Sequence, residues 1–196
     1  FSDDVTPLFE NVKLGESTIP NRLVVQPMEG YDSDNEGAPS ELTERRYLRY
    51  SAGASGVIWF EAVSVNHDGR SNPRQLWLNN KSSDKFAYLN EKIRKNSGIN
   101  GGTPFLVIQL THSGRYSKPE GKPAPRVAAL NPLLDRTTPV VLSDDDLKRL
   151  QDQYVGAAKL ASGAGFDAVD LKACHGYLMI ELLAAKNRTN SIFGGE

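Results

Sequence analysis

Short apolar runs alternate with amphipathic segments along this 196-residue chain. The runs rich in β-branched residues, typical of buried parallel strands, are 23–27, 56–63, 105–110 and 167–172. Apolar residues recur at helical spacing in four other segments, 42–52, 84–95, 144–162 and 177–186. In the second of these, Phe86, Leu89 and Ile93 share one face. This alternation predicts an α/β fold with a parallel sheet.

Local signals mark where several elements begin and end. Ser40 and Ser143 stand where they would cap helices, and three aspartates follow Ser143 in the first turn. Gly15 separates 8–14 from 17–22, which predicts a short hairpin before the first strand.

Four βα units indicate the first half of a (β/α)₈ TIM barrel, whose usual length is about 250 residues. A doubly wound sheet is the competing architecture, but no Gly-x-Gly-x-x-Gly follows the first strand. Long segments follow strands two and three, the second of them irregular from 111 to 142. In a barrel they would lie at the C-terminal rim, where active sites form. We expect residues 1–196 to form the N-terminal half of one barrel domain, with the hairpin covering its bottom. Apolar residues such as Val24, Ile58 and Val107 are expected on the inner faces of its strands.

Composition excludes several classes of protein. The 23 Lys and Arg nearly balance 24 Asp and Glu, which argues against a dedicated nucleic-acid binder. No apolar run approaches the roughly 20 residues of a membrane helix, and the first residues lack signal-peptide character. The single cysteine, Cys174, fits a reducing cytoplasm, and without a Cys-x-x-Cys pair no metal site is visible. We therefore expect a cytoplasmic protein.

The richest group of reactive side chains lies where the fourth strand runs into a helix. Lys172, His175 and Tyr177 cluster there, and Gly176 permits a close turn. A cation, an imidazole and a phenol can together bind a carbonyl oxygen and deliver a proton. A solvated lysine and a helix-capping histidine explain the same residues.

Polar residues also interrupt the other strands. Gln109 is a neutral amide inside an apolar strand, so it pairs within the barrel or faces a ligand. His112 and Arg115 follow at the rim, where an ordinary loop is the better explanation of the stretch taken alone. Pro27 ends the first strand and exposes backbone groups. Glu61 is an acid within an apolar strand, which an internal ion pair explains as well as function does.

Six stretches in this order and spacing resemble the old yellow enzyme family of NADH:flavin oxidoreductases. They run the length of the chain: Pro7-Leu-Phe, Asn21-Arg-Leu-Val-Val-Gln-Pro-Met, Gly56-Val-Ile-Trp-Phe-Glu-Ala, Ile108-Gln-Leu-Thr-His-Ser-Gly-Arg, Ala164-Gly-Phe-Asp-Ala-Val-Asp-Leu, and His175-Gly-Tyr-Leu with a closing Gly-Gly. Each stretch is weak alone, but six in register are specific. The chain is most similar to the bacterial branch that includes dienoyl-CoA reductases.

The resemblance implies a cofactor and a role for each matching residue. FMN would be the cofactor, with NADH or NADPH as its reductant. Backbone groups of Pro27, Met28 and Glu29, with Ala62, would line the flavin, and Gln109 would bind its pyrimidine edge. Lys172 and His175 would hold the substrate carbonyl, and Tyr177 would donate the proton. The implied reaction reduces the activated C=C bond of an α,β-unsaturated carbonyl compound.

The chain departs from the family pattern at three places. Lys172 stands where the family usually has His, Glu29 replaces a small or thiol-bearing residue, and the usual Arg-Thr-Asp is altered within 187–195. The family continues with four more strands, so we expect this chain to associate with itself or with the missing half-barrel. Two alternatives remain at this point: a non-catalytic barrel fragment, and a barrel aldolase that uses Lys172 as a Schiff base.

Overall fold

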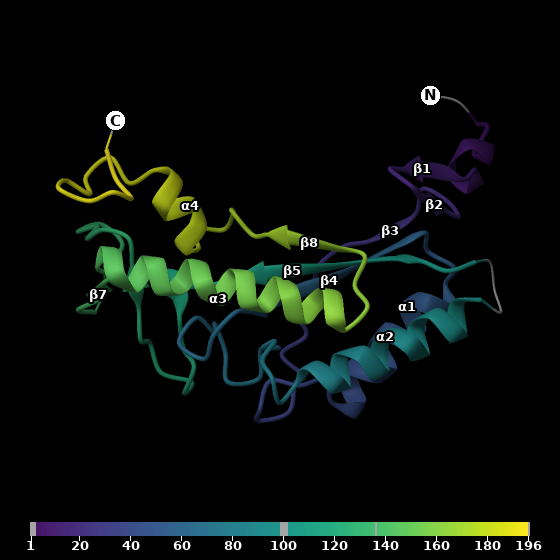
Figure 1. Cartoon of the computed structure of the whole chain (residues 1–196), viewed down its shortest axis with the longest axis horizontal. Helices are drawn as coiled ribbons and strands as arrows, with labels where there is room; N and C mark the ends of the chain where they lie inside the picture. The colour runs from purple at the N-terminus through teal and green to yellow at the C-terminus, as the bar shows by residue number, and fades with distance from the viewer. Residues whose placement is uncertain (1–2, 99–101, 136, 196) are drawn as a thin grey trace.

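A sheet of four parallel strands lies at the centre of the computed structural model, which describes residues 3–98, 102–135 and 137–195. The strands are β3 (Val24–Val25), β4 (Val57–Ser64), β5 (Phe105–Thr111) and β8 (Ala168–Leu171). They lie side by side in chain order, and every neighbouring pair is parallel (Figure 1). A doubly wound sheet would reverse its order beside the first strand. The predicted barrel arrangement of the four strands is therefore confirmed.

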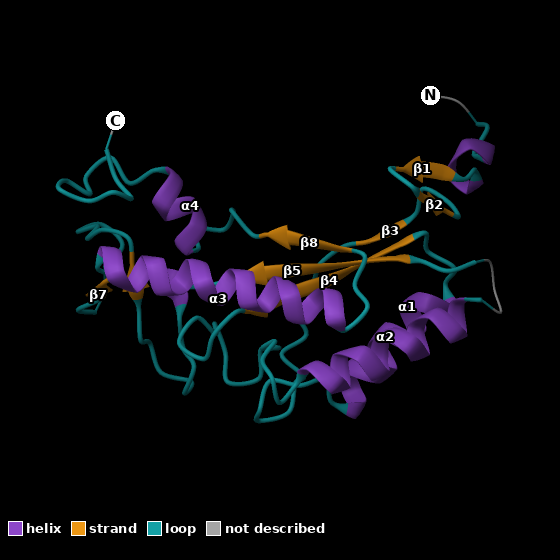
Figure 2. Cartoon of the chain, in the orientation of Figure 1, coloured by secondary structure: helices purple, strands orange, loops and turns teal. Residues whose placement is uncertain are grey.

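The three long helices lie on one side of this sheet (Figure 2). They are α1 (Glu41–Ala52), α2 (Ser83–Ser97) and α3 (Asp144–Gly163). Ser40 and Ser143 cap α1 and α3, and in both capping boxes the third helical residue bonds back to the cap. The fourth helix, α4 (Leu178–Leu183), is shorter than predicted. The chain leaves it early, so that Ala185 is buried and Arg188 reaches the carbonyl of Ala128.

The hydrophobic core fills the space between the sheet and these helices. Its largest members from the sheet are Ile58, Phe60, Leu106, Ile108 and Leu110. Ile58 was expected on the inner face of the barrel, and that prediction was wrong. Ile58 is in register with Leu106, and side chains in register project from the same face of a sheet. The alternate residues, including Trp59 and Val107, project from the inner face.

Shorter elements complete the fold. The hairpin pairs β1 (Val12–Leu14) with β2 (Ser17–Ile19) around Gly15, whose φ is +58°. It is shorter than predicted, because residues 8 and 9 belong to the 3₁₀ helix η1 (Thr6–Phe9), which has Pro7 near its start. The hairpin lies near the N-terminal end of β4, where Ile19 packs against Gly56. The long stretch after β5 contains η2 (Gly114–Tyr116), β6 (Arg126–Val127) and β7 (Val140–Val141). No helix within the described residues is long and apolar enough to cross a bilayer.

Candidate functional site

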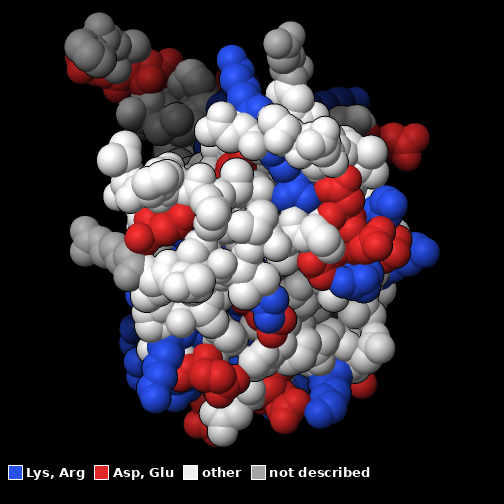
Figure 3. Space-filling model, turned by 90° about the vertical axis from the view of Figure 1, so that its left-hand side faces the viewer, with Lys and Arg blue, Asp and Glu red and all other residues white. Residues whose placement is uncertain are grey.

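The predicted site residues come from all four strands. Residues 27–29 follow β3, Ala62 lies in β4, Gln109 lies in β5, and 172–177 follow β8. The strands point toward the left in Figure 1, and Figure 3 views the molecule from that end. Uncharged side chains fill much of the centre of this face, and charged groups gather mainly near its borders. The C-terminal ends of the strands therefore point toward a face whose centre carries few charged side chains.

Lys172, His175 and Tyr177 lie around one phenol ring. The Lys172 ammonium lies 4.6 Å from the centre of the Tyr177 ring, and both residues are at least nine-tenths buried. The ring centres of His175 and Tyr177 are 6.5 Å apart. His175 has a φ of +58° and Gly176 one of +68°, so two successive left-handed residues make the turn into α4. His175 itself is exposed, with its Nδ1 atom 3.0 Å from the Cys174 sulfur.

Burial strengthens the preference of the Tyr177 phenol for its protonated form. Burial, together with the negative charge of Glu29, raises the pKa of Tyr177 to about 12, although the nearby hydroxyls of Ser71 and Ser113 favour its ionised form. The phenol is therefore protonated at neutral pH and can donate a proton.

Glu29 lies beside this group and is held by two donors. Its Oε1 atom is 3.9 Å from Lys172 Nζ and accepts a 3.0 Å hydrogen bond from Gln75 Nε2. Its Oε2 atom accepts a 2.9 Å bond from the Tyr31 hydroxyl. Gln75 also donates to the carbonyl of Ala62 at 2.9 Å, which ties β4 into the same cluster. Sequence reasoning missed Tyr31 and Gln75, because no motif marks them.

Gln109 projects from the inner face of β5, away from the hydrophobic core. Its neighbours Ile108 and Leu110 enter the core on the opposite face of β5. Gln109 Nε2 donates a 2.7 Å hydrogen bond to Asp170, its partner in register on β8. This bond fixes which way the amide points, and no described residue bonds to the amide oxygen of Gln109. Asp170 belongs to the family-like stretch that begins at Ala164, but the sequence did not predict that it would orient Gln109.

Glu61 belongs to a buried structural network rather than to the open part of the site. The register between β4 and β5 shifts between Phe60 and Ala62, which leaves Glu61 without a partner in the sheet. Its carboxylate accepts hydrogen bonds from Arg46 and from the backbone N–H of Gly30, and Tyr47 lies within 3.4 Å. The internal ion pair considered from the sequence is thus present.

Arg46 extends this network to the loop after β3. It also binds Asp32 through two nitrogens and lies 3.5 Å from the carbonyl of Met28. Burial lowers the pKa of Arg46, but the Asp32 hydrogen bond and the charge of Glu61 raise it above its ordinary value. Burial raises the pKa of Glu61, and Arg46 opposes that rise. The network therefore positions residues 28–30 from α1.

His112 and Arg115 are structural. His112 is 2% exposed, and its Nδ1 atom accepts a 3.1 Å bond from Gly114. Burial, with a smaller contribution from the nearby positive charge of Arg126, lowers the pKa of His112 to about 4, so its ring is neutral. Arg115 is paired with Asp135 and Glu181, which ties the segment after β5 to α4.

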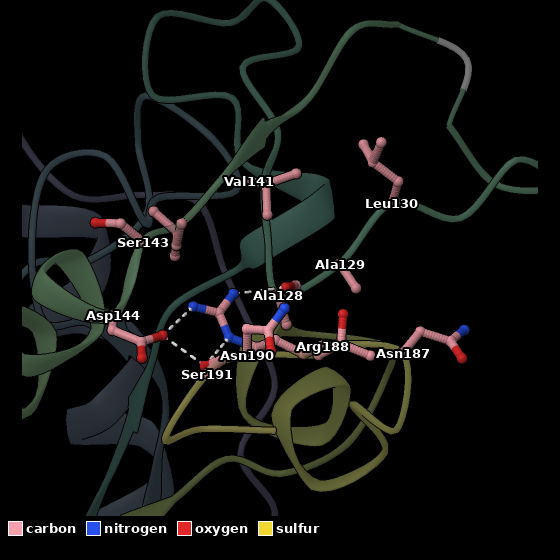
Figure 4. A pocket seen from close by; sticks show the side chains of 12 residues that line it. Ala128, Ala129, Leu130, Val141, Ser143, Asp144, Asn187, Arg188, Asn190 and Ser191 are labelled. Atoms are coloured by element: carbon pink, nitrogen blue, oxygen red, sulfur yellow. Dashed lines mark hydrogen bonds and ion pairs between the residues drawn. The ribbon is translucent and has the colours of Figure 1, made fainter. Parts of the chain in front are cut away.

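A cavity of about 590 Å³ lies away from these residues, between the segment around Ala128 and the C-terminal loop (Figure 4). Arg188 lines this cavity, and its side chain binds Asp144 at 2.8 Å and Ser191 at 2.8 Å. A hydrogen bond from Ser191, the backbone N–H of Ile192 and the Arg188 charge lower the pKa of Asp144 to about 2. This network anchors the 187–195 segment to the start of α3.

The described part of the chain contains no cluster of metal-binding side chains. Among residues 3–98, 102–135 and 137–195, no three or more His, Cys, Asp or Glu side chains are grouped to hold an ion.

Known proteins match the chain over nearly its whole length. The sequence model of the NADH:flavin oxidoreductase / NADH oxidase family matches residues 7–195. The NADPH dehydrogenase of Clostridium acetobutylicum is 31% identical over 192 residues, which cover 96% of this chain and 54% of that protein. The NADPH dehydrogenase of Bacillus pumilus is 34% identical, with 97% and 55% covered. The chain thus spans about half the length of these curated relatives.

Solved structures match the fold to a similar extent. The old yellow enzyme homologue from Zymomonas mobilis superposes with a TM-score of 0.79 at 23% identity, covering 96% of this chain and 55% of that one. Morphinone reductase gives a TM-score of 0.78 at 23% identity, with 96% and 54% covered. At this level of identity the likeness concerns the fold alone, and it identifies the four strands as part of a larger (β/α)₈ barrel.

Proposed function

The chain belongs to the NADH:flavin oxidoreductase / NADH oxidase family, and on that premise we propose that it forms part of an FMN-dependent reductase of activated alkenes. The family match favours this reading over an aldolase that uses Lys172 as a Schiff base. A cytoplasmic location remains a prediction from the composition.

The residues at the strand ends fit a flavin. Gln109 offers an amide oxygen, whose orientation Asp170 fixes, toward the polar edge of an isoalloxazine ring. Pro27 and the 70% exposed side chain of Met28 offer apolar surface beside it. The carbonyl of Ala62 already accepts from Gln75, so Ala62 would contact the ring without bonding through that group. Pro27, Met28, Glu29, Ala62 and Gln109 are thus the proposed cofactor-binding residues.

Bound FMN would supply the redox chemistry, by accepting a hydride from NADH or NADPH and passing it to the β-carbon of the alkene. Lys172 and His175 would bind the substrate carbonyl oxygen and stabilise the negative charge that develops there. Tyr177 would donate its phenolic proton to the α-carbon. His175 is exposed, and its Nδ1 atom lies 3.0 Å from the Cys174 sulfur, which leaves Nε2 as the ring nitrogen for the carbonyl.

One observation carries the proposal: at the C-terminal end of the inner face, the buried Lys172 ammonium lies 4.6 Å from the centre of the Tyr177 ring, whose phenol is protonated. This pair offers the charge and the proton that the reduction of an enone requires. Family membership supplies the expectation of a flavin beside it.

The test is spectroscopic and kinetic. The purified flavoprotein should absorb near ~450 nm, lose that band when NADPH or NADH is added, and regain it with cyclohexenone. A colourless protein that retains no added FMN would contradict the proposal. A flavin that is reduced but not reoxidised by any enone would leave the cofactor assignment standing and overturn the substrate class.

We also propose that further barrel strands pair with the open edges of this sheet. Val169 and Leu171, on the edge strand β8, are 43% and 50% exposed, and an unpaired edge attracts another strand. A polypeptide of residues 1–196 alone should therefore self-associate in sedimentation or bind the complementary half-barrel. A monomer holding one FMN per chain would refute this.

A further inference from the structure

Lys172 has a carboxylate of the protein as its counter-charge. Glu29 is the acidic side chain that pairs with Lys172 among the described residues, at 3.9 Å from Oε1 to Nζ. The two side chains are 15% and 8% exposed, so solvent screens the pair only weakly. At 3.9 Å the contact is too long for a hydrogen bond, and the ammonium keeps its N–H groups available for a ligand.

The Glu29 carboxylate is not free to move away from this position. Gln75 Nε2 and the Tyr31 hydroxyl hold its two oxygens at 3.0 and 2.9 Å. Gln75 is itself fixed, since it donates to the Ala62 carbonyl at 2.9 Å and accepts a 2.6 Å bond from the Ser71 backbone. A negative charge is thereby built into the wall of the proposed substrate site.

We infer that Glu29 is a specificity-determining residue, which makes the Lys172 site accept neutral carbonyl ligands and reject carboxylates and phenolates. This inference rests on the proposed function, because it assigns Lys172 to the ligand carbonyl. It concerns the class of ligand that the site selects, which the family match leaves open.

Electrostatics gives the reason. A ligand oxygen bonded to Lys172 Nζ at roughly 2.9 Å would lie at most about 7 Å from Glu29 Oε1. A carboxylate at that distance experiences the repulsion of Glu29 together with the attraction of Lys172. A neutral carbonyl accepts the same hydrogen bond from Lys172 without bringing a second negative charge into a buried site.

Acetophenone and benzoate test the inference, because they have similar shapes and differ in charge. Their affinities are measured at neutral pH by titrating the flavin-loaded protein and following its absorbance. The wild-type protein should bind acetophenone more tightly than benzoate. In Glu29→Gln, which keeps the size of the side chain and its hydrogen-bonding capacity, benzoate should bind about 10–100-fold more tightly. Acetophenone binding should change by less than about threefold.

Two controls separate the charge effect from others. Glu36→Gln removes an exposed carboxylate that pairs with Lys81 at 3.1 Å, and it should leave both affinities unchanged. Adding Lys172→Met to Glu29→Gln should abolish the gain in benzoate affinity.

The outcomes distinguish this inference from the proposed function. A wild-type protein that binds benzoate as tightly as acetophenone overturns the inference without any variant, as does a Glu29→Gln protein whose benzoate affinity is unchanged. In both cases a flavin that is still reduced by NAD(P)H and reoxidised by enones leaves the proposed function intact. A protein that holds no flavin refutes the proposed function instead.

Discussion

Two carboxylate–cation pairs flank the loop after β3, and they differ in how completely they are satisfied. Glu61 is fully buried, and its partner Arg46 touches it at 2.5 Å while also binding Asp32. Glu29 and Lys172 are separated by 3.9 Å, and the ammonium faces an aromatic ring on another side. In the first pair the N–H groups of Arg46 donate to protein carboxylates, whereas in the second pair N–H groups of Lys172 have no acceptor among the described residues.

The difference separates a structural role from a binding role. A buried charge whose partners are all internal can position backbone but cannot recognise a ligand. A buried charge with unused donors carries an energetic cost that a ligand can relieve. By this criterion the Glu61–Arg46 pair positions the loop after β3, and Lys172 is the buried charge that can still bind a ligand.

The largest expected effect tests whether the phenol beside Lys172 acts chemically. Tyr177→Phe should slow alkene reduction by about 10²–10⁴-fold, because it removes the proton donor and keeps the ring. Flavin reduction by NADPH should remain nearly unchanged, and stopped-flow measurement of the two half-reactions compares them. Tyr116→Phe, whose ring centre lies 6.0 Å from that of Tyr177, is the matched control. Equal losses in both half-reactions would show that Tyr177 is structural.

Arg46→Met tests the Glu61–Arg46 pair. It leaves Glu61 buried without its counter-charge, so the free energy of unfolding should fall by about 3–5 kcal/mol. Denaturant titration of the wild type and the variant measures the difference. A loss below about 1 kcal/mol would mean that the Glu61–Arg46 network does not support the loop after β3.

His112 provides a third case, a buried ionisable group that forms no ion pair with any carboxylate in the described part of the chain. Its folded-state pKa of about 4 lies below the ordinary 6.5, so the folded state disfavours the protonated ring. The resulting stability is fully present above pH 6.5 and is lost as the pH falls toward 4. The loss amounts to roughly 3 kcal/mol at 1.36 kcal/mol per pKa unit.

Unfolding free energies measured between pH 7 and 4 test this expectation. His112→Gln should flatten the dependence on pH, whereas the same change at His67, which is 42% exposed, should retain it. A wild-type slope that survives in His112→Gln would assign the dependence to other groups.

The smallest effect on stability is expected from Lys172→Met, which removes the cation of the Glu29–Lys172 pair as Arg46→Met removes that of the Glu61–Arg46 pair. The unfolding free energy should fall by no more than about 1 kcal/mol, because the substitution also removes the desolvation cost of a buried ammonium, and Glu29 keeps its hydrogen bonds from Gln75 and Tyr31. Acetophenone should bind about tenfold more weakly, since a charged donor to its oxygen is lost. Unchanged ligand binding would remove Lys172 from the site, and a loss of stability as large as that of Arg46→Met would erase the contrast between the pairs.

Most of the fold could be predicted because its signals are local. Runs of β-branched residues and helical spacing located all four strands and the three long helices, and Ser40 and Ser143 marked two helix starts. The side chains around Tyr177 could be grouped in advance, because strand ends meet at one rim of a barrel. The predictions that failed or fell short concern Ile58, the length of α4 and the extent of the hairpin, where tertiary contacts override local pattern.

The sequence by itself determined the order of elements and the family, since both depend on residue types and spacing along the chain. Tertiary structure alone decided which charges meet. A register shift beside Glu61 turns that carboxylate to α1, and a partner 46 positions away holds Glu29. Asp170 orients Gln109 only because β5 and β8 pair in that register. Pairings between distant segments depend on strand register and on the bulge, and neither leaves a periodic trace in the sequence.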